Sequence, residues 1–169
     1  GFQINQQGLA VDIYEDYRKQ VSPLTMFKSS NSQLYVLAGI DAQEKGLDEG
    51  LILNEKGAII ESTNSNIFAV CNGVLYTPSL SEGCVAGTMR MKIMNLAMDM
   101  GLKIFECSLN HQRLMSADEV FLTNAVRGIQ WVNRYKSKRY FHKLSDQLIE
   151  ALNEDIFREI SSATDHLEN

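Results

Sequence analysis

The sequence contains little of what would mark several specialised protein classes. Only 2 of its 169 residues are proline, and its 3 cysteines and 3 histidines are scattered without a CxxC pair. An odd number of scattered cysteines provides neither a disulfide framework nor the spacing of a zinc site, and it favours a reducing compartment, the cytoplasm. No apolar run approaches the roughly 20 residues of a membrane span, and no signal peptide is visible.

An excess of positive charge is also missing. The formal net charge is −5, and no basic face or arm of the kind that binds nucleic acid is visible. The one basic run, "NRYKSKRYFHK" over residues 133–143, is interpreted as a solvated surface connector. We therefore expect neither a nucleic acid nor a membrane as a partner.

What the sequence does contain fits one compact domain in which strands and helices intermix. Hydrophobic residues make up 44% of the chain, enough to bury a core. The strongest local signal is "SNIFAVCNGVLYTP", in which two alternating runs flank Asn72-Gly73, the pair preferred in a type I′ hairpin turn. Further strands are predicted in "FQINQQGLAVDIYEDYRK", "GLILNEKGAIIES", "LKIFECSL" and "DEVFLTNAV". The pattern indicates an α/β or α+β domain.

Apolar residues at helical spacing predict the helices. "NSQLYVLAGIDAQEKG" is expected to begin at a cap formed by Ser30 or Asn31 and to end at Gly46. A second helix is expected from about Thr88 to Met100, before Gly101. Its buried face is predicted to contain Met89, Ile93, Leu96, Ala97 and Met100.

The remaining helices lie in the second half of the chain. "HQRLMSA" predicts a short helix, and "SDQLIEALNEDIFREI", over residues 145–160, predicts a terminal helix capped by Ser145. The buried stripe of the terminal helix is predicted to contain Leu148, Ile149, Leu152, Ile156 and Phe157.

Lys28 is the first residue with possible chemistry. It stands between the apolar run Leu24–Phe27 and the polar trio Ser29–Asn31. Most lysines in such a place are surface residues whose stems pack on apolar neighbours. The functional alternative is a desolvated, nucleophilic amine that forms a Schiff base with an aldehyde.

Glu61 is the second such residue. It ends an apolar run in "AIIESTNSNIFAV", and hydroxyl and amide residues, Ser65 and Asn66 among them, separate it from Ile67. An ordinary polar loop between strands would look the same. The functional interpretation is a carboxylate near the floor of a pocket that pairs with a heterocyclic nitrogen, with Ser and Asn groups supporting it.

The third segment is "SEGCVAGTMR", in which Gly83 and Gly87 precede the helix expected from Thr88. Such a loop presents free backbone N–H groups and a favourable dipole to a phosphate, although many helices begin after a glycine without binding anything. Together the three segments contain the parts needed to hold pyridoxal phosphate. These parts are an aldehyde-binding lysine, an acid for the ring nitrogen and an anion-binding helix start.

The order of these segments resembles the class IV aminotransferases, the fold-type IV pyridoxal-phosphate enzymes. "FKSSN" resembles the lysine segment of that family, and "IIESTNSNIF" resembles its signature E-x-[ST]-x-[SA]-N-[IL]-F. "TPSLSEGCVAGTMR" is similar to its phosphate-binding loop, and "ADEVFLTNAVRGI" to the late strand that borders the cofactor. The resemblance runs from about Pro23 to Val132. It implies the large C-terminal domain of the D-amino-acid aminotransferase-like fold, a mixed-sheet α/β pseudo-barrel.

The resemblance also implies roles for single residues around the cofactor ring. Lys28 would form the Schiff base with pyridoxal phosphate and then move the proton. Glu61 would pair with the pyridine nitrogen, and Val85 would pack on the ring.

The phosphate of the cofactor is assigned to the helix start by the same resemblance. Backbone N–H groups of Thr88 and Met89, directly after Gly87, would hold it. Three residues at the end of the late strand are alternatives for a position near the phosphate, and the choice among them stays open: Thr123, Asn124 and Ala125.

Within the family, the spacing after Lys28 is more like that of the 4-amino-4-deoxychorismate lyases and the D-amino-acid aminotransferases, and the late strand resembles the lyase version. Asn31 follows Lys28 by three residues, and position 33 is Gln where branched-chain enzymes carry the Tyr of an Asn-Tyr pair. Asn124 stands where those enzymes tend to carry Gly. We therefore expect a lyase that releases pyruvate and leaves 4-aminobenzoate, a folate precursor. The alternatives are an aminotransferase for branched-chain or D-amino acids and an inactive fragment of such an enzyme.

The resemblance covers only the cofactor-binding part of such an enzyme. Family members carry a smaller N-terminal domain, which supplies an arginine to the phosphate and one wall of the substrate pocket. We interpret residues 1–22 as a lead-in from such a domain, which this chain lacks, and Arg18 is not assigned the arginine's role. A homodimer with the active site near the subunit interface is expected.

Overall fold

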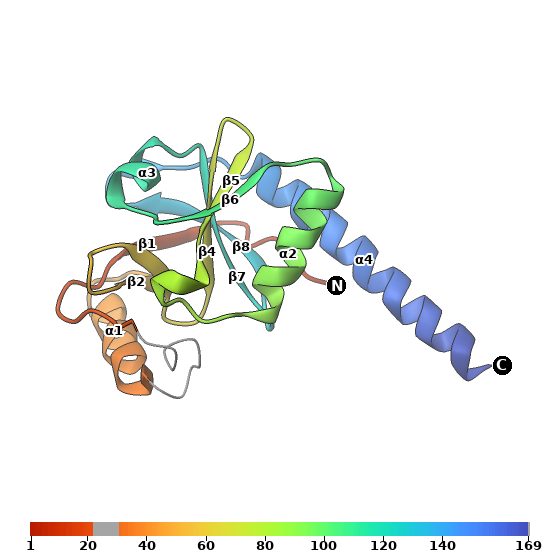
Figure 1. Ribbon diagram of the computed structural model, residues 1–169, viewed down its shortest axis with the longest axis horizontal. Helices are drawn as coiled ribbons and strands as arrows, with labels where there is room; N and C mark the ends of the chain where they lie inside the picture. The colour runs from red at the N-terminus through yellow and green to blue at the C-terminus, as the bar shows by residue number, and fades with distance from the viewer. Residues whose placement is uncertain (22–30, 169) are drawn as a thin grey trace.

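One strongly curved sheet organises the molecule in the computed structural model, which describes residues 1–21 and 31–168 (Figure 1). Its strands are β1 (Leu9–Ile13), β2 (Glu49–Leu53), β3 (Ile59–Ser62), β4 (Asn66–Cys71), β5 (Val74–Pro78), β6 (Ile104–Cys107), β7 (Glu119–Asn124), β8 (Gly128–Tyr135) and β9 (Lys138–Arg139). The order is β3-β2-β1-β8-β7-β4-β5-β6, with β9 paired to β8. β1 runs parallel to β2 and β8, and β5 parallel to β6, whereas the other pairs are antiparallel.

The two ends of this sheet approach each other. Ile59, at the start of β3, donates its backbone N–H to the carbonyl of Leu109, just beyond β6, at 2.9 Å. The sheet therefore curls into a pseudo-barrel, and the predicted mixed-sheet α/β fold is confirmed. The barrel interior is filled by a cluster of buried apolar side chains that includes Val11, Leu51, Ile67, Leu122, Val132 and Tyr135.

Helices pack against the sheet. They are α1 (Ser32–Glu44), α2 (Thr88–Asp99), α3 (His111–Ser116) and α4 (Lys143–Leu167). α2 and α4 pack side by side over β4, β7 and β8, where Phe68, Phe121 and Ile93 belong to a second apolar cluster (Figure 1). α1 lies against β2 at the other end of the molecule, over a third cluster that contains Tyr14, Ala38 and Ile52.

Several predicted boundaries are confirmed. Asn72 and Gly73 connect β4 to β5 with φ angles of 51° and 75°, the left-handed conformation that a type I′ turn needs at both positions. Gly46 follows α1 closely, and Asn31 occupies its N-cap position, although its side chain makes no capping hydrogen bond. Gly101 follows Met100, the C-cap of α2.

The prediction of a surface connector over residues 133–143 is wrong. This segment contains the end of β8, a hairpin to β9 and the start of α4. Tyr135 is completely buried and Tyr140 is 7% exposed, so the aromatic residues between the charges hold the segment on the core. The basic side chains alternate with them and remain at least partly exposed, which is the pattern of a strand with one buried face.

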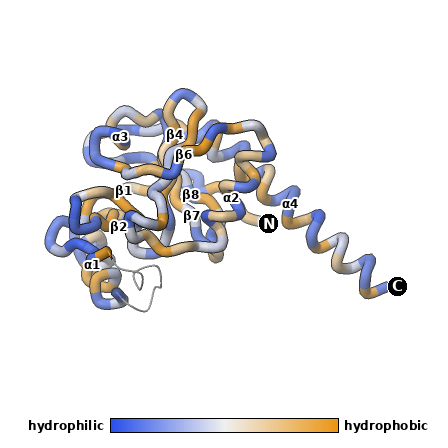
Figure 2. Tube along the Cα trace, in the orientation of Figure 1, coloured by the Kyte–Doolittle hydropathy of each residue, from blue (hydrophilic) through white to orange (hydrophobic). Residues whose placement is uncertain are grey.

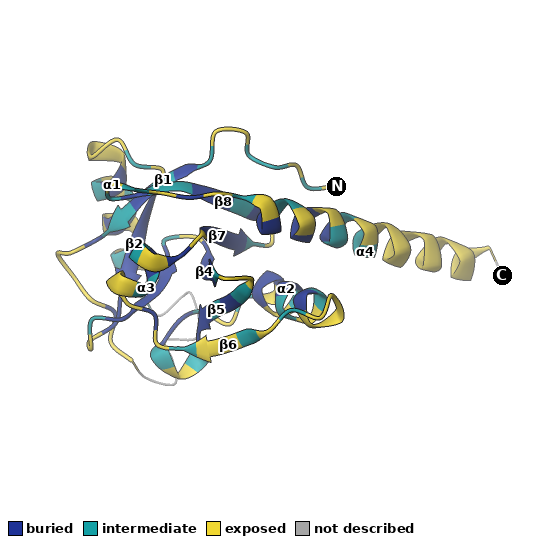
Figure 3. Cartoon of the chain, turned by 90° about the horizontal axis from the view of Figure 1, so that it is seen from above, coloured by how far each residue is buried: buried dark blue, intermediate teal, exposed yellow. Residues whose placement is uncertain are grey.

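The predictions for the helices are wrong at one cap and at two face positions. α4 begins at Lys143 after His142, so Ser145 lies inside the first turn, where its hydroxyl donates to Glu119. Phe157 is 72% exposed because α4 continues to Leu167 and projects beyond the body of the molecule (Figure 3). The projecting part alternates between hydrophilic and hydrophobic residues (Figure 2). Met100 is 41% exposed at the end of α2.

Candidate cofactor site

A cavity lies where β3 and β7 end and where β4 and α2 begin. Seven of the residues considered for the cofactor site line this cavity: Glu61, Ser65, Asn66, Val85, Gly87, Thr123 and Asn124. They come from three segments that are far apart in the sequence. The antiparallel pairing of Asn66 with Thr123 brings β4 and β7 together there, and Gly87 is the N-cap of α2.

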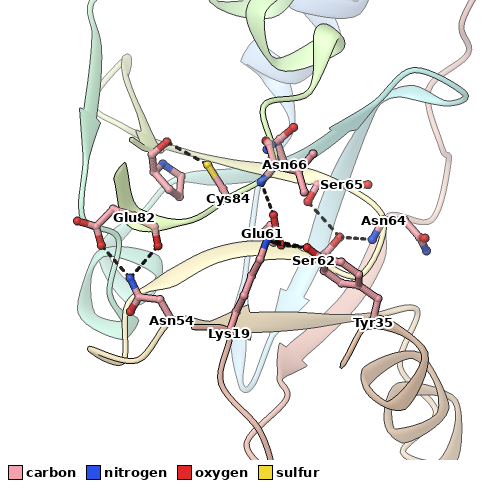
Figure 4. Close-up of polar contacts among 12 residues, drawn as sticks. Lys19, Tyr35, Asn54, Glu61, Ser62, Asn64, Ser65, Asn66, Glu82 and Cys84 are labelled. Atoms are coloured by element: carbon pink, nitrogen blue, oxygen red, sulfur yellow. Dashed lines mark hydrogen bonds and ion pairs between the residues drawn. The ribbon is translucent and has the colours of Figure 1, made fainter. Parts of the chain in front are cut away.

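The carboxylate of Glu61 is held at the cavity wall by three donors (Figure 4). Its Oε2 accepts hydrogen bonds from the Lys19 ammonium at 3.0 Å and from the Tyr35 hydroxyl at 2.6 Å. Its Oε1 accepts from the backbone N–H of Val85 at 2.6 Å. Glu61 is 2% exposed, so these bonds replace the water that a surface carboxylate would have.

Tyr35 acts as a donor in this arrangement. Burial and the neighbouring Glu61 carboxylate raise the pKa of the Tyr35 hydroxyl well above its usual range. The hydroxyl therefore keeps its proton and donates a hydrogen bond to the carboxylate. Its oxygen accepts a hydrogen bond from Lys19 at 2.7 Å. The three side chains form a closed triangle of hydrogen bonds.

The loop before α2 is tied to the end of the sheet. Asn66 donates from its side-chain Nδ2 to the carbonyl of Val85 at 2.7 Å. Gly87 packs so closely that a Cβ placed on it would overlap the side-chain Oδ1 of Asn66. Its φ of −71° is ordinary for any residue, so space alone requires glycine here. The Val85 N–H that holds Glu61 and the start of α2 are thereby fixed to one another.

The opposite part of the cavity offers donors to an anion. α2 has no side-chain cap, so its first N–H groups have no acceptor within the helix. Thr123 is 1% exposed and lines the cavity, and its Oγ1 has no hydrogen-bond partner within residues 1–21 and 31–168. An unsatisfied buried hydroxyl beside an uncapped helix start fits a group with several acceptor oxygens, such as a phosphate.

Asn124 and Ser65 complete the rim of the cavity. Asn124 donates from Nδ2 to the Ser65 hydroxyl at 3.0 Å, while its Oδ1 accepts from the backbone N–H groups of Val126 and Arg127 at 3.0 and 2.8 Å. This set of bonds connects the end of β7 to the turn between β3 and β4. It also fixes the orientation of the Asn124 side chain.

Thr88, Met89 and Ala125 are not among the residues that line this cavity. Thr88 and Met89 are the first two residues of α2, next to Gly87, and the Met89 side chain packs in the core under α2. Ala125 is exposed in the turn after β7. Lys28 lies outside the described residues.

Sequence reasoning missed two members of the site, Lys19 and Tyr35. Lys19 stands in the charged stretch "YEDYRKQ", where no pattern separates it from its exposed neighbours. Tyr35 offered a weak signal, because it shares a helix face with Ala38 and Ala42, the two buried residues of α1. The apolar residues Leu37 and Ile40, which predict this helix, are 45% and 49% exposed and lie on another face.

The chain belongs to the family described as amino-transferase class IV, whose pattern matches residues 4–135. Pyridoxal phosphate is the cofactor that this membership indicates. A relative from Methanocaldococcus jannaschii, named a putative branched-chain-amino-acid aminotransferase, is 39% identical over 102 residues, which cover 60% of this chain and 35% of the relative.

Two solved structures show the same fold. A Legionella pneumophila protein described as a putative 4-amino-4-deoxychorismate lyase superposes with a TM-score of 0.83 at 29% identity, over 91% of this chain and 58% of that one. The branched-chain amino acid aminotransferase of Thermobaculum terrenum, in its PLP form, superposes with a TM-score of 0.79 at 27% identity, over 90% of this chain and 50% of that one.

The match spans about a third of the length of the first curated relatives and 52% of the Pseudomonas aeruginosa one. Within residues 1–21 and 31–168, none of the helices combines the length and the apolar character needed to cross a membrane.

Proposed function

We propose that this chain is the cofactor-binding domain of a pyridoxal-phosphate enzyme that acts on a small amine or amino acid. The observation that carries the proposal is the buried carboxylate of Glu61, held by three donors at the wall of a cavity that ends at an uncapped helix start. When bound, pyridoxal phosphate supplies an electron sink for negative charge that develops beside the substrate's nitrogen.

In this proposal, different residues of the cavity bind different parts of the cofactor. Glu61 accepts the proton-bearing ring nitrogen and keeps the ring cationic. The first N–H groups of α2 and the Thr123 hydroxyl donate to the phosphate. Val85 packs on the ring, and the hydrogen bonds of Asn66 hold the loop that carries Val85.

Lys28 completes the site in this proposal. Its amine would bond to the cofactor aldehyde and would later move the substrate's proton. The support is the similarity of "FKSSN" to the lysine segment of the family that the chain belongs to.

As the reaction, we propose the conversion of 4-amino-4-deoxychorismate to 4-aminobenzoate and pyruvate. The enolpyruvyl group leaves as pyruvate and the ring becomes aromatic, so no water or second substrate is consumed. Support comes from Asn124, which is fixed at the rim by Ser65 where branched-chain enzymes tend to carry Gly. The likeness to the Legionella pneumophila structure adds to it.

Amino transfer is the second candidate, with a branched-chain or D-amino acid as substrate. The curated relatives favour it, because relatives from several organisms are named branched-chain-amino-acid aminotransferases. In this reaction Lys28 would move the same proton, but a 2-oxo acid would receive the amino group.

The assembly of the whole protein is also proposed. We infer a cytoplasmic homodimer in which an N-terminal domain closes the substrate side of the cavity. The lengths of the relatives, of which this chain spans only a part, support the further domain.

Cofactor binding is tested by adding pyridoxal phosphate to the chain. We expect a visible absorbance band and, after borohydride reduction, a modified peptide that contains Lys28. Lys28→Ala should lose both, whereas Lys56→Ala, at an exposed position, should lose neither. If the wild-type chain gives neither a band nor an adduct, this domain does not bind the cofactor and the proposal is wrong.

The two reactions are separated with the full-length protein and 4-amino-4-deoxychorismate. A lyase releases pyruvate and 4-aminobenzoate in equal amounts without an added 2-oxo acid. Amino transfer from a branched-chain or D-amino acid to a 2-oxo acid, with no release of pyruvate from 4-amino-4-deoxychorismate, would refute the lyase. If neither reaction occurs although the cofactor binds, the protein is an inactive relative.

A further inference from the structure

Lys19 is the most deeply buried cation of the described chain, and it faces Glu61. Its side chain is completely inaccessible to solvent, and its backbone N–H donates to the carbonyl of Leu53 at 2.8 Å, at the end of β2. The ammonium lies 3.0 Å from Glu61 Oε2 and 5.4 Å from the centroid of the Tyr35 ring. Lys19 and Glu61 are 42 residues apart in the sequence, so the fold alone brings them together.

The contacts of Glu61 do not use all the acceptor positions of its carboxylate. An ionised carboxylate has about four acceptor positions, two on each oxygen. Lys19 and Tyr35 fill both positions on Oε2, whereas Oε1 accepts only from the Val85 N–H among the described residues. One acceptor position on Oε1 therefore remains, on a residue that lines the cavity.

The position of Lys19 is unsuitable for bonding to the cofactor aldehyde. The aldehyde carbon and the ring nitrogen of pyridoxal phosphate stand on opposite sides of the pyridine ring. An amine that binds the carboxylate reserved for the ring nitrogen is therefore at the wrong end of the cofactor. Its chemistry there is that of a fixed positive charge.

We propose that Lys19 is a positioning residue: with Tyr35, it neutralises Glu61 and turns the carboxylate so that the free position of Oε1 receives the protonated ring nitrogen of pyridoxal phosphate. The inference rests on the proposed function, since it assumes this cofactor. A buried carboxylate without a cation takes up a proton, and a protonated Glu61 no longer keeps the ring nitrogen charged. Lys19 thus determines the electronic state of the cofactor without touching it.

The test compares three variants of the chain with the wild type. Lys19→Met removes the charge but keeps the length of the side chain, Lys19→Arg keeps a charge, and the pair Lys19→Met with Glu61→Gln removes both charges. Lys92 forms ion pairs with Asp155 and Glu159 on the surface, and Lys92→Met is the control for loss of a lysine charge. Thermal unfolding without cofactor first shows which variants fold.

Pyridoxal phosphate is then titrated into each folded variant and its absorbance is recorded. We expect Lys19→Met to bind about tenfold more weakly and to shift the cofactor band to shorter wavelength, because the ring nitrogen loses its proton. Lys19→Arg should restore part of both properties, and Lys92→Met should match the wild type. The doubly neutral variant should regain thermal stability but keep the shifted band.

The other outcomes overturn the proposal in distinguishable ways. If the Lys19→Met variant or the doubly neutral variant keeps the wild-type band and affinity, the ion pair has only a structural role. The proposal that the chain binds the cofactor would then remain. A borohydride adduct on Lys19 would make it the aldehyde-binding lysine instead. If the wild-type chain binds no pyridoxal phosphate, the proposed function and this inference both fail.

Discussion

Among single residues, Gly87 is the position where the site has the least free space. The Asn66 side chain that a Cβ would meet cannot move away freely, because its Nδ2 is bonded to the Val85 carbonyl. We expect Gly87→Ala to lower the free energy of unfolding by about 1–3 kcal/mol, the usual cost of overpacking. It should also weaken the binding of pyridoxal phosphate, since the start of α2 must shift.

Gly39 provides the matched control for that substitution. It lies in the middle of α1, and a Cβ placed on it meets nothing within 4 Å. Gly39→Ala should therefore stabilise the chain by about 0.5–1 kcal/mol, because alanine loses less entropy in a helix. Chemical denaturation of both variants measures the two values. Equal effects at the two positions would show that Gly87 is not sterically required.

For whole elements, a buried carboxylate binds the start of α4. Glu119, the first residue of β7, is 5% exposed and accepts from the backbone N–H groups of Leu144 and Ser145 at 2.9 and 3.0 Å, as well as from the Ser145 hydroxyl at 2.9 Å. A carboxylate here satisfies N–H groups of the first turn and interacts favourably with the helix dipole. It therefore replaces the cap that Ser145 was predicted to form.

Glu119→Gln tests this attachment. The neutral amide has one acceptor oxygen in place of two and brings a donor toward other donors, so we expect a loss of about 1.5–3 kcal/mol in the free energy of unfolding. Glu150→Gln, on the exposed side of the same helix, should stay within about 0.5 kcal/mol of the wild type. Urea denaturation followed by circular dichroism measures both. A small effect of Glu119→Gln would mean that apolar packing alone holds α4.

For the whole molecule, local patterns predict the elements but not the contacts between them. The Asn72-Gly73 turn and the limits of α2 follow from a few neighbouring residues, and the structure confirms them. The residues around Glu61 could not be found in that way. Lys19 reaches Glu61 only because its segment continues beside the end of β2. In the sequence, a lysine that becomes buried cannot be told from one that stays exposed.

The cavity also connects parts of the fold that pack around different cores. Glu61 lies in the barrel strand β3 and Asn66 begins β4, whereas the start of α2 belongs to the layer outside the sheet. A ligand that contacts both should stabilise the whole chain, and at 100 times its dissociation constant it adds about 2.7 kcal/mol. For a domain of this size we expect a rise in Tm of about 5–10 °C with pyridoxal phosphate.

Pyridoxal without its phosphate provides the matched control ligand in that experiment. It retains the ring nitrogen that Glu61 accepts but offers nothing to the α2 start or to the buried Thr123 hydroxyl. We therefore expect a clearly smaller rise in Tm at the same concentration, measured by differential scanning calorimetry. In Gly87→Ala the difference between the two ligands should shrink, since the displaced helix start loses the phosphate contacts. Equal shifts for both ligands in the wild-type chain would refute the assignment of the α2 start as the phosphate site, while leaving the role of Glu61 intact.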